Sequence, residues 1–402
     1  MFTIVNIKLF TFVTQYKTMD SLQLATDNLE PKLKGKFIHL DVILPLLESL
    51  KSVFEITEIG KSVLNRPIHQ VKIGTGKTKI LMWSQMHGNE PTTTKGLFDF
   101  FNFLSNDSEV AQQIKNKYTL LCIPMLNPDG AFAYTRENAN LVDLNRDAYL
   151  SSQPEMKLLR TLHKDFKPDL CYNLHDQRTI FGTEGFNLPA TISFLAPAYN
   201  ESRDYNEVRL KAIVIINKMN KALQEYIPNQ VGRFDDSYNV NCTGDFFTTQ
   251  NKPTILFEAG HFQGDYTREE SRKFIFIALL SSLLGNYENV IVDNELDDYL
   301  RIPQNNKRFF DFIYKNVKII DNSVEKIINF AAQYQEVLID GKIHFTAIIS
   351  KISDLEDYSG HVEYDCEALL FNSEGKCFPE LGKKATFELN NLTKFNNGLK
   401  II

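Results

Sequence analysis

Cysteine, basic charge and long apolar runs are all scarce in this chain of 402 residues. Its five cysteines are odd in number, lie far apart and form no C-x-x-C pair, which argues against a disulfide framework and against a cysteine zinc knuckle. No run reaches about 18 uninterrupted apolar residues, so we expect no membrane-spanning helix. Lys and Arg number 44 against 50 Asp and Glu, a net charge of −6. A general nucleic-acid binder needs a basic footprint and is not expected.

The first 18 residues lack the marks of a secretory signal. They are apolar, but they have no basic n-region, Lys8 interrupts them and no A-x-A cleavage site follows. We therefore expect residues 1–18 to be an unstructured extension or, with Met19 as the true start, no part of the protein. A cytoplasmic location is the default expectation.

Apolar strand-like runs alternate with amphipathic helical stretches from Phe37 to about Ile291. The predicted strands are Ile80–Gln85, Tyr118–Met125, Asp169–Leu174 and Pro253–Phe257. The predicted helices span about 92–104, 154–164 and 268–284. Continuous apolar strands separated by helices imply a sheet covered on both faces, so we expect an α/β domain over residues 19–300.

The pattern changes after Leu300, where short strands and turn signals replace helices. The predicted strands are Phe309–Ile320, Glu336–Ile349, Glu363–Phe371 and Ala385–Leu389. Asp340-Gly341 and Ser373-Glu374-Gly375 are the turn signals that break them. Residues 301–402 are therefore predicted to form a separate, small β-rich domain.

The segment Gly74-Thr75-Gly76-Lys77-Thr78 resembles the end of a phosphate-binding loop. That motif needs a glycine five positions before Gly76, where Val71 stands, and a helix directly after the loop. A predicted strand follows instead, so we interpret the segment as a hairpin turn.

Four residues of types that bind metals follow predicted strands. His87 and Glu90 lie three residues apart on the turn after the first strand, where both can reach one ion. His175 and Glu258 end two further strands. Each residue alone has a simpler explanation, such as a solvated turn or a structural histidine. A carboxylate that ends a buried strand is costly, however, unless it has a partner or a task.

Two further polar motifs lie beyond the predicted strand Tyr118–Met125. The first is Asn127-Pro128-Asp129-Gly130, which is also ideal chemistry for an ordinary turn. The second is Arg136, followed by Asp143-Leu144-Asn145-Arg146-Asp147. These arginines either form surface ion pairs or recognise an anion, since a planar guanidinium is a natural partner for a carboxylate.

The common placement of these motifs strengthens each of them. All lie beyond the carboxyl ends of predicted strands, where α/β sheets bind ligands. Two histidines and one glutamate make a His₂Glu set for one zinc ion with an open fourth position, and Glu258 is left over as a general base.

The ordered run H-x-x-E, N-P-D-G, R-x₈-N-R, strand-end His and strand-end Glu resembles the zinc carboxypeptidase family of carboxypeptidase A type. The motifs HGNE and DLNRD are most similar to those of its bacterial and cytosolic branches. The resemblance covers roughly residues 37–291. It implies a mixed, twisted sheet with helices on both faces, and a metallopeptidase that hydrolyses C-terminal peptide bonds.

The resemblance also implies a role for each matching residue. The implied zinc ligands are His87, Glu90 and His175, and the implied general base is Glu258. Arg136 matches the arginine that stabilises the oxyanion. The implied binders of the substrate carboxylate are Asn145 and Arg146, and Asp143 matches the acid that orients a zinc-bound histidine. Tyr238 is the nearest candidate for a substrate-contacting loop tyrosine.

Other functions use the same residues. A zinc amidohydrolase of small N-acyl amino acids, similar to the desuccinylases and aspartoacylases, shares the HGNE and DLNR patterns, and a murein-peptide amidase is a third variant. The N-P-D-G motif and the long insert between Asn187 and Asn251 favour peptides. A non-catalytic peptide- or glycan-binding module would have lost a ligand or the base, and none is lost. The expected partner is a peptide or acylated amino acid with a free carboxylate.

Overall fold

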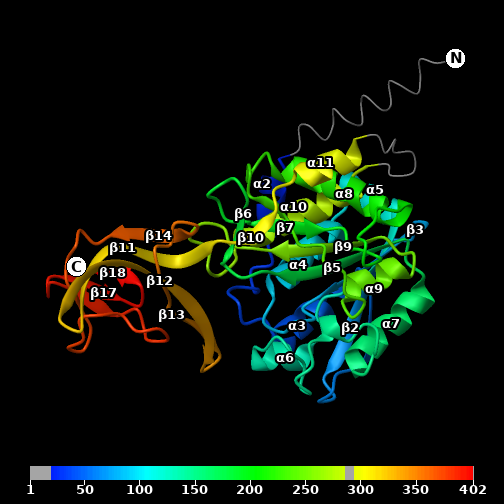
Figure 1. Cartoon of the computed structure of the whole chain (residues 1–402). Coiled ribbons are helices and arrows are strands. Elements are labelled where there is room, and N and C mark those ends of the chain that lie inside the picture. Colours follow the sequence, from blue (N-terminus) through cyan, green and yellow to red (C-terminus); the bar gives the residue numbers. More distant parts are fainter. Residues whose placement is uncertain (1–19, 286–293, 402) are drawn as a thin grey trace.

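A computed structural model describes residues 20–285 and 294–401 of the chain. The extension predicted at residues 1–18 lies outside the described residues. A larger α/β part and a smaller β-rich part lie side by side (Figure 1). No helix within the described ranges is long and apolar enough to cross a membrane.

The larger part is built on one sheet of eight strands in the order β1-β2-β4-β3-β5-β9-β7-β8. β4, β3, β5 and β9 are parallel neighbours, whereas β1, β2 and β7 pair antiparallel. The sheet is therefore mixed, as predicted. Its strands are β1 (Glu55–Lys61), β2 (Pro67–Ile73), β3 (Thr78–Ser84), β4 (Tyr118–Ile123), β5 (Leu170–Asp176), β7 (Ile192–Leu195), β8 (Val231–Arg233) and β9 (Thr254–Ala259).

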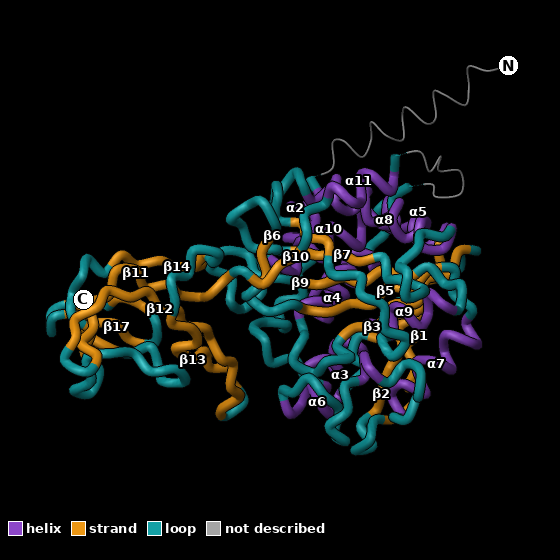
Figure 2. Tube along the Cα trace, in the orientation of Figure 1, coloured by secondary structure: helices purple, strands orange, loops and turns teal. Residues whose placement is uncertain are grey.

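Helices cover both faces of this sheet (Figure 2). Alternate side chains of β3 enter two different cores: Ile80 and Met82 pack on one face, and Leu81 and Trp83 on the other. The first core includes residues of α2 (Ser21–Asp27), α3 (Leu40–Leu50), α4 (Thr92–Ser105), α5 (Glu109–Lys117), α8 (Glu207–Leu223), α10 (Ser271–Leu283) and α11 (Glu295–Arg301). The second core includes residues of α7 (Pro154–Phe166) and α9 (Thr243–Thr249). The predicted α/β class is confirmed.

The interpretation of residues 74–78 as a hairpin turn is wrong. β2 pairs with β4 and not with β3, so the segment connects two strands that are not neighbours. A Cβ on Gly76 would lie 1.9 Å from the carbonyl carbon of Lys117, because the connection passes directly over the start of β4. This close approach, rather than a phosphate, accounts for the glycine.

The smaller part contains two four-stranded sheets, β13-β12-β11-β14 and β15-β16-β17-β18. The first consists of β11 (Phe309–Asp321), β12 (Val324–Ile339), β13 (Lys342–Ile352) and β14 (Ser359–Asp365). The second consists of β15 (Phe371–Asn372), β16 (Phe387–Leu389), β17 (Thr393–Asn396) and β18 (Leu399–Lys400). A separate two-stranded sheet pairs β10 (Asn305–Lys307) with β6 (Phe181–Thr183) of the larger part.

The predicted strand Glu336–Ile349 is two strands of a hairpin. β12 begins at Val324 and β13 begins after a turn at Asp340-Gly341, where both residues have positive φ angles. β14 and β15 likewise divide the predicted strand Glu363–Phe371. Local turn chemistry marks the breaks, but the early half of β12 is stabilised by pairing with β11, and β13 pairs with its later half from Phe330 onward.

The hairpin β12–β13 packs on the larger part close to the predicted site. Glu336 accepts a hydrogen bond from the Tyr134 hydroxyl and forms an ion pair with Lys36. The ring centroids of Tyr266 and Tyr334 lie 5.0 Å apart. A cavity of about 480 Å³ lies between the hairpin and the larger part, and Glu90 is among its lining residues.

Candidate metal centre

The loop after β3 is held in place by its neighbours on both sides. A Cβ on Gly88 would lie 1.9 Å from the carbonyl carbon of Gly130, so only glycine fits where this loop passes the N-P-D-G segment. The Asn127 side-chain amide donates to the carbonyl of Met86 at 3.1 Å, and its side-chain oxygen accepts from the Gly130 N–H. The N-P-D-G segment, which opens α6 (Pro128–Ala133), therefore supports the loop rather than forming a free turn.

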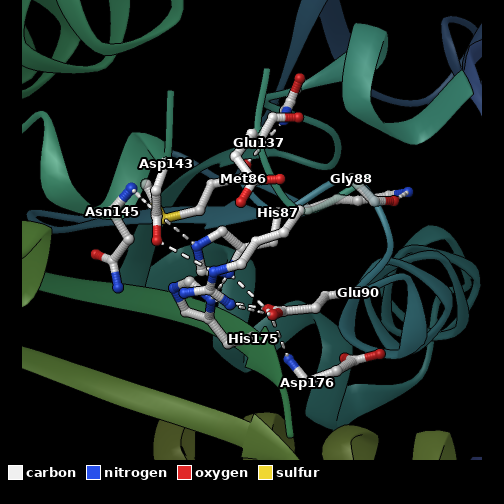
Figure 3. A network of polar contacts seen from close by, with 12 residues as sticks. Met86, His87, Gly88, Glu90, Glu137, Asp143, Asn145, His175 and Asp176 are labelled. Carbon is white, nitrogen blue, oxygen red and sulfur yellow. Dashed lines mark hydrogen bonds and ion pairs between the residues drawn. The ribbon is translucent and has the colours of Figure 1, made fainter. Parts of the chain in front are cut away.

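His87, Glu90 and His175 converge at the carboxyl end of the sheet (Figure 3). Glu90 lies 2.9 Å from the Nδ1 atom of each histidine, and the two Nδ1 atoms are 3.0 Å apart. His87 and His175 are almost completely buried. Parallel pairing of β3 with β5 brings the turn that carries His87 next to the strand end that carries His175. The three predicted ligands thus face one point.

Asp143 fixes the orientation of this cluster. Its carboxylate contacts His87 Nε2 at 2.9 Å, and it accepts hydrogen bonds from Arg136 Nε at 3.1 Å and from the Asn145 N–H at 2.8 Å. Because Asp143 engages Nε2, the Nδ1 atom of His87 is left to face Glu90 and His175. This is the arrangement by which carboxylates orient metal-bound histidines.

The cluster fits one zinc ion. Its ligand atoms all lie within 4.8 Å of one another, and tetrahedral coordination with bonds near 2.1 Å separates ligand atoms by about 3.4 Å. Burial lowers the pKa of His175 to about 4, so that its imidazole is neutral at pH 7, as a ligand must be. Burial also lowers the pKa of His87, but the carboxylates of Glu90 and Asp143 outweigh it and raise the pKa.

Glu258 lies beside the cluster on the neighbouring strand β9. It stands opposite His175 in the pairing of β5 with β9. Its side chain is 8% exposed, and Oε2 has no hydrogen-bond partner in the described part of the chain. Burial raises the pKa of Glu258 well above its ordinary value; the carboxylates of Glu90 and Asp176 add to this, and Arg136 opposes it. A buried carboxylate with a raised pKa is suited to proton transfer.

One cleft of about 600 Å³ joins most of the predicted site; we call it the metal cleft. Its lining includes His87, Glu90, Arg136, Asn145, Arg146, His175, Tyr238 and Glu258. Asp143 is the one predicted site residue that does not line the metal cleft, and it contacts His87 and Arg136 from behind. The structure therefore brings all nine predicted residues together.

Two arginines that line the metal cleft contact identified partners. Arg136 pairs with Glu90 at 3.0 Å and with Asp143, and these carboxylates raise its pKa against the effect of burial. Arg146 follows in the short 3-10 turn Leu144–Arg146 and donates to the carbonyl of Asn145. The Asn145 side-chain oxygen accepts from the N–H of Thr243, which begins α9.

Three further residues of the cleft were not predicted. Asp176 accepts hydrogen bonds from Thr92 and Thr93 and so fixes the start of α4, two residues after Glu90. The carbonyl of Gln177 accepts from the buried Arg268. Asp176 and Gln177 directly follow His175 in the sequence, and this position was the signal from which they could have been predicted. Asp245 lies in α9 within the apolar segment TGDFFTT, where no sequence signal marks it.

Comparison with known proteins identifies relatives of this chain. Residues 42–160 match the family described as zinc carboxypeptidase. The chain is 25% identical over 179 residues to Carboxypeptidase 2 of Trichophyton tonsurans, a match that covers 44% of this chain and 32% of that protein. Over 82 residues it is 37% identical to gamma-D-glutamyl-L-diamino acid endopeptidase 1 of Lysinibacillus sphaericus, covering 18% of this chain and 21% of that protein.

Solved structures support the same relationship at the level of fold. Thrombin activatable fibrinolysis inhibitor is 15% identical to this chain, with a TM-score of 0.52 over 67% of this chain and 81% of that one. The chain spans about a third of the length of the first curated relative it matches. The resemblance predicted from the order of the motifs is confirmed, and residues 42–160 of this chain are similar to the zinc carboxypeptidase family.

Proposed function

We propose that this protein is a zinc-dependent peptidase that hydrolyses the C-terminal peptide bond of its substrate. The observation that carries the proposal is the buried carboxylate of Glu258, unpartnered among the described residues and facing the same cleft as the His87, Glu90 and His175 cluster. His87, Glu90 and His175 would hold the ion, which when bound supplies Lewis acidity to the scissile carbonyl and to water.

The remaining residues divide the chemistry between proton transfer and charge stabilisation. Glu258 accepts a proton from the attacking water and delivers it to the departing amine, so that its raised pKa serves both steps. Arg136 stabilises negative charge that develops on the carbonyl oxygen; one such donor is typically worth about 3–4 kcal/mol. Asp143 keeps His87 and Arg136 in their orientations.

Substrate positioning is assigned to the opposite side of the cleft. Arg146 binds the free terminal carboxylate with charge-assisted hydrogen bonds, and the Asn145 side chain assists it from a position fixed by Thr243. Tyr238, in the segment between β8 and α9, covers the substrate side chain. Fixing the terminal carboxylate places the last peptide bond over the metal set, which is how a carboxypeptidase selects that bond.

The decisive experiment is mass spectrometry of peptides incubated with zinc-loaded protein. Each sequence is supplied with a free and with an amidated C-terminus, alongside N-acyl amino acids. We expect release of the last residue from the free peptides only. Equal cleavage of the amidated peptides would contradict the carboxypeptidase assignment, and hydrolysis of the N-acyl amino acids alone would instead indicate a small-molecule amidohydrolase.

A murein-peptide hydrolase is the second candidate. The short match to the Lysinibacillus sphaericus endopeptidase has a higher identity than the match to the fungal carboxypeptidase. The same experiment therefore includes a γ-D-glutamyl-diamino acid peptide. Preferential cleavage of that peptide over ordinary C-terminal bonds would establish this candidate in place of the first.

A further inference from the structure

A second concave site lies away from the metal cleft, between α7 and the segment that runs from α9 to β9. It has a volume of about 530 Å³, and we call it the α7–α9 groove. Five cations line it: Lys157, Arg160, Lys164, Lys167 and Lys252. No carboxylate is among its described lining residues, and neither acid of α7, Glu155 or Asp165, belongs to the lining.

Three of these cations have an arrangement on α7 that is unfavourable for a helix. Lys157, Arg160 and Lys164 follow one another at spacings of three and four residues, which places three like charges on one face of α7. Such pairs destabilise a helix. The negative end of the helix dipole accounts for cations in the last turn, but Lys157 and Arg160 lie too far back for that effect.

The five cations also lack counter-charges. None of them forms an ion pair with any carboxylate in the described ranges, whereas Arg136 and Arg209 elsewhere in the same part are both paired. A cluster of like charges that no carboxylate of the protein neutralises is expected where a site binds a charged ligand.

The floor of the groove is rigid and aromatic. Phe246 and Phe247 are buried, the Arg160 guanidinium lies 4.7 Å above the Phe246 ring, and His163 stacks on Phe247 at 4.1 Å. Arg160 Nη1 also donates to the carbonyls of Ala148 and Tyr149. Arg160 is thus fixed, while the exposed lysines around it can move to fit a ligand.

The pKa of His163 reflects the same positive potential in the groove. Burial is the largest cause of its lowered pKa, which falls to about 4, and the charges of Lys252 and Arg160 lower it further. Lys252 comes from a segment almost ninety positions later in the sequence, so the positive potential is assembled by the fold rather than by α7 alone.

We propose that the α7–α9 groove binds a compact, multiply charged oxyanion of the phosphate or polyphosphate class. A single carboxylate is satisfied by one bidentate arginine, whereas five cations around one concavity call for several negative charges. Tetrahedral phosphate groups present enough oxygens to accept from several ammonium groups at once. The proposal does not rest on the proposed peptidase chemistry, because no predicted metal ligand lines the groove.

Calorimetric titration with inorganic pyrophosphate at constant ionic strength tests this site in the full-length protein. We expect a dissociation constant below about 1 mM. The triple variant Lys157→Gln, Lys164→Gln, Lys252→Gln should weaken binding about tenfold or more, because it removes three of the five cations that line the groove. Trp83, the single tryptophan, lies 5.5 Å from Phe247 and provides fluorescence as a second readout.

A matched control removes the same charge elsewhere. Lys315→Gln, Lys326→Gln, Lys394→Gln takes three lysines from exposed ion pairs of the smaller part and should leave pyrophosphate affinity unchanged. Equal loss in both triple variants would overturn the proposal, because only net charge would then matter. Absence of binding by the wild type would overturn it as well, as would binding of poly-glutamate without binding of pyrophosphate.

A second arm identifies the source of the phosphate. Vesicles with equal parts of phosphatidylcholine and phosphatidic acid are sedimented with the protein, against vesicles of phosphatidylcholine alone. Sedimentation with the acidic vesicles that pyrophosphate abolishes would assign the groove to lipid headgroups. Pyrophosphate binding without vesicle binding would assign it to a soluble phosphate compound, and either result supports an oxyanion site.

Discussion

The metal cleft and the α7–α9 groove share helix α9 but differ in the charges that line them: carboxylates line the metal cleft and none lines the groove in the described part of the chain. Gly244 and Asp245 of α9 line the metal cleft, and Phe246 and Phe247 line the groove. In the metal cleft the Arg136 guanidinium is held by two carboxylates. In the groove, within the described chain, no carboxylate faces any of the five cations.

This difference indicates what each site lacks. The metal cleft is rich in acids and contains two imidazoles, and the missing charge there is a cation that two histidines and a glutamate can share. The groove is rich in cations, and the missing charge is an anion. Changes on the two sides of α9 should therefore have separate consequences, and the following predictions proceed from the largest expected effect to the smallest.

Glu258→Gln should have the largest effect. Removing the proton acceptor lowers kcat by about 10²–10⁴-fold while zinc stoichiometry stays at one, because Glu258 is not in the ligand set. Steady-state kinetics and metal analysis measure the two quantities. Glu363→Gln, an exposed site in the smaller part, is the matched control. Full activity of Glu258→Gln would remove this residue as the base.

Asp143→Asn should weaken metal binding without removing a ligand. The carboxylate that contacts His87 Nε2 is lost, and residues in such positions typically contribute about 10–100-fold to metal affinity. Competition with a chelator measures the zinc dissociation constant, and Asp107→Asn serves as an exposed control. An unchanged constant would show that Asp143 does not orient the histidine.

Arg146→Ala should act on the substrate carboxylate. Loss of hydrogen bonds to a charged group, worth about 1.5–3 kcal/mol, lowers kcat/KM about 10–100-fold for peptides with a free C-terminus. Any residual hydrolysis of amidated peptides should change little. Steady-state kinetics on matched pairs of peptides separates the two cases, and equal losses on both would assign Arg146 a structural role.

Sequence reasoning located the metal cleft and missed the groove for one physical reason. The residues of the metal set end strands that local apolar runs already mark, and parallel neighbours bring His87, His175 and Glu258 to one edge of the sheet. The groove depends on Lys252 meeting α7, and no local pattern predicts that meeting. The contact of Glu336 in β12 with Tyr134 was missed for the same reason, because it joins segments that are far apart in the sequence. The start of that strand was also predicted too late.

Asp245 of the metal cleft and His163 of the groove should change the stability of the protein in opposite directions as pH rises. Burial raises the pKa of Asp245 to about 7, so its contribution to stability is complete below its unfolded pKa and is lost as pH rises through 7. Burial lowers the pKa of His163 to about 4, so its contribution is complete above its unfolded pKa and is lost as pH falls towards 4. Thermal unfolding of Asp245→Asn and His163→Gln between pH 4 and 8 separates them. Between about pH 4 and 7, Asp245→Asn should remove a loss of stability as pH rises, and His163→Gln should remove a gain of stability over the same range. Identical profiles would contradict the difference between the sites.

The smallest effects should distinguish two kinds of cation within the groove. The lysines of the triple variant donate to no loop of the metal cleft, so kcat/KM should stay within about twofold of the wild type, as for surface substitutions away from a site. Arg160 differs, because it donates to the carbonyls of Ala148 and Tyr149, directly after the turn that carries Arg146. Arg160→Gln should therefore raise KM several-fold with little change in kcat, since the lost hydrogen bonds shift a loop rather than the base. If the lysine variant loses as much activity as Arg160→Gln, charge in the groove itself acts on the metal cleft, and the two sites are not independent.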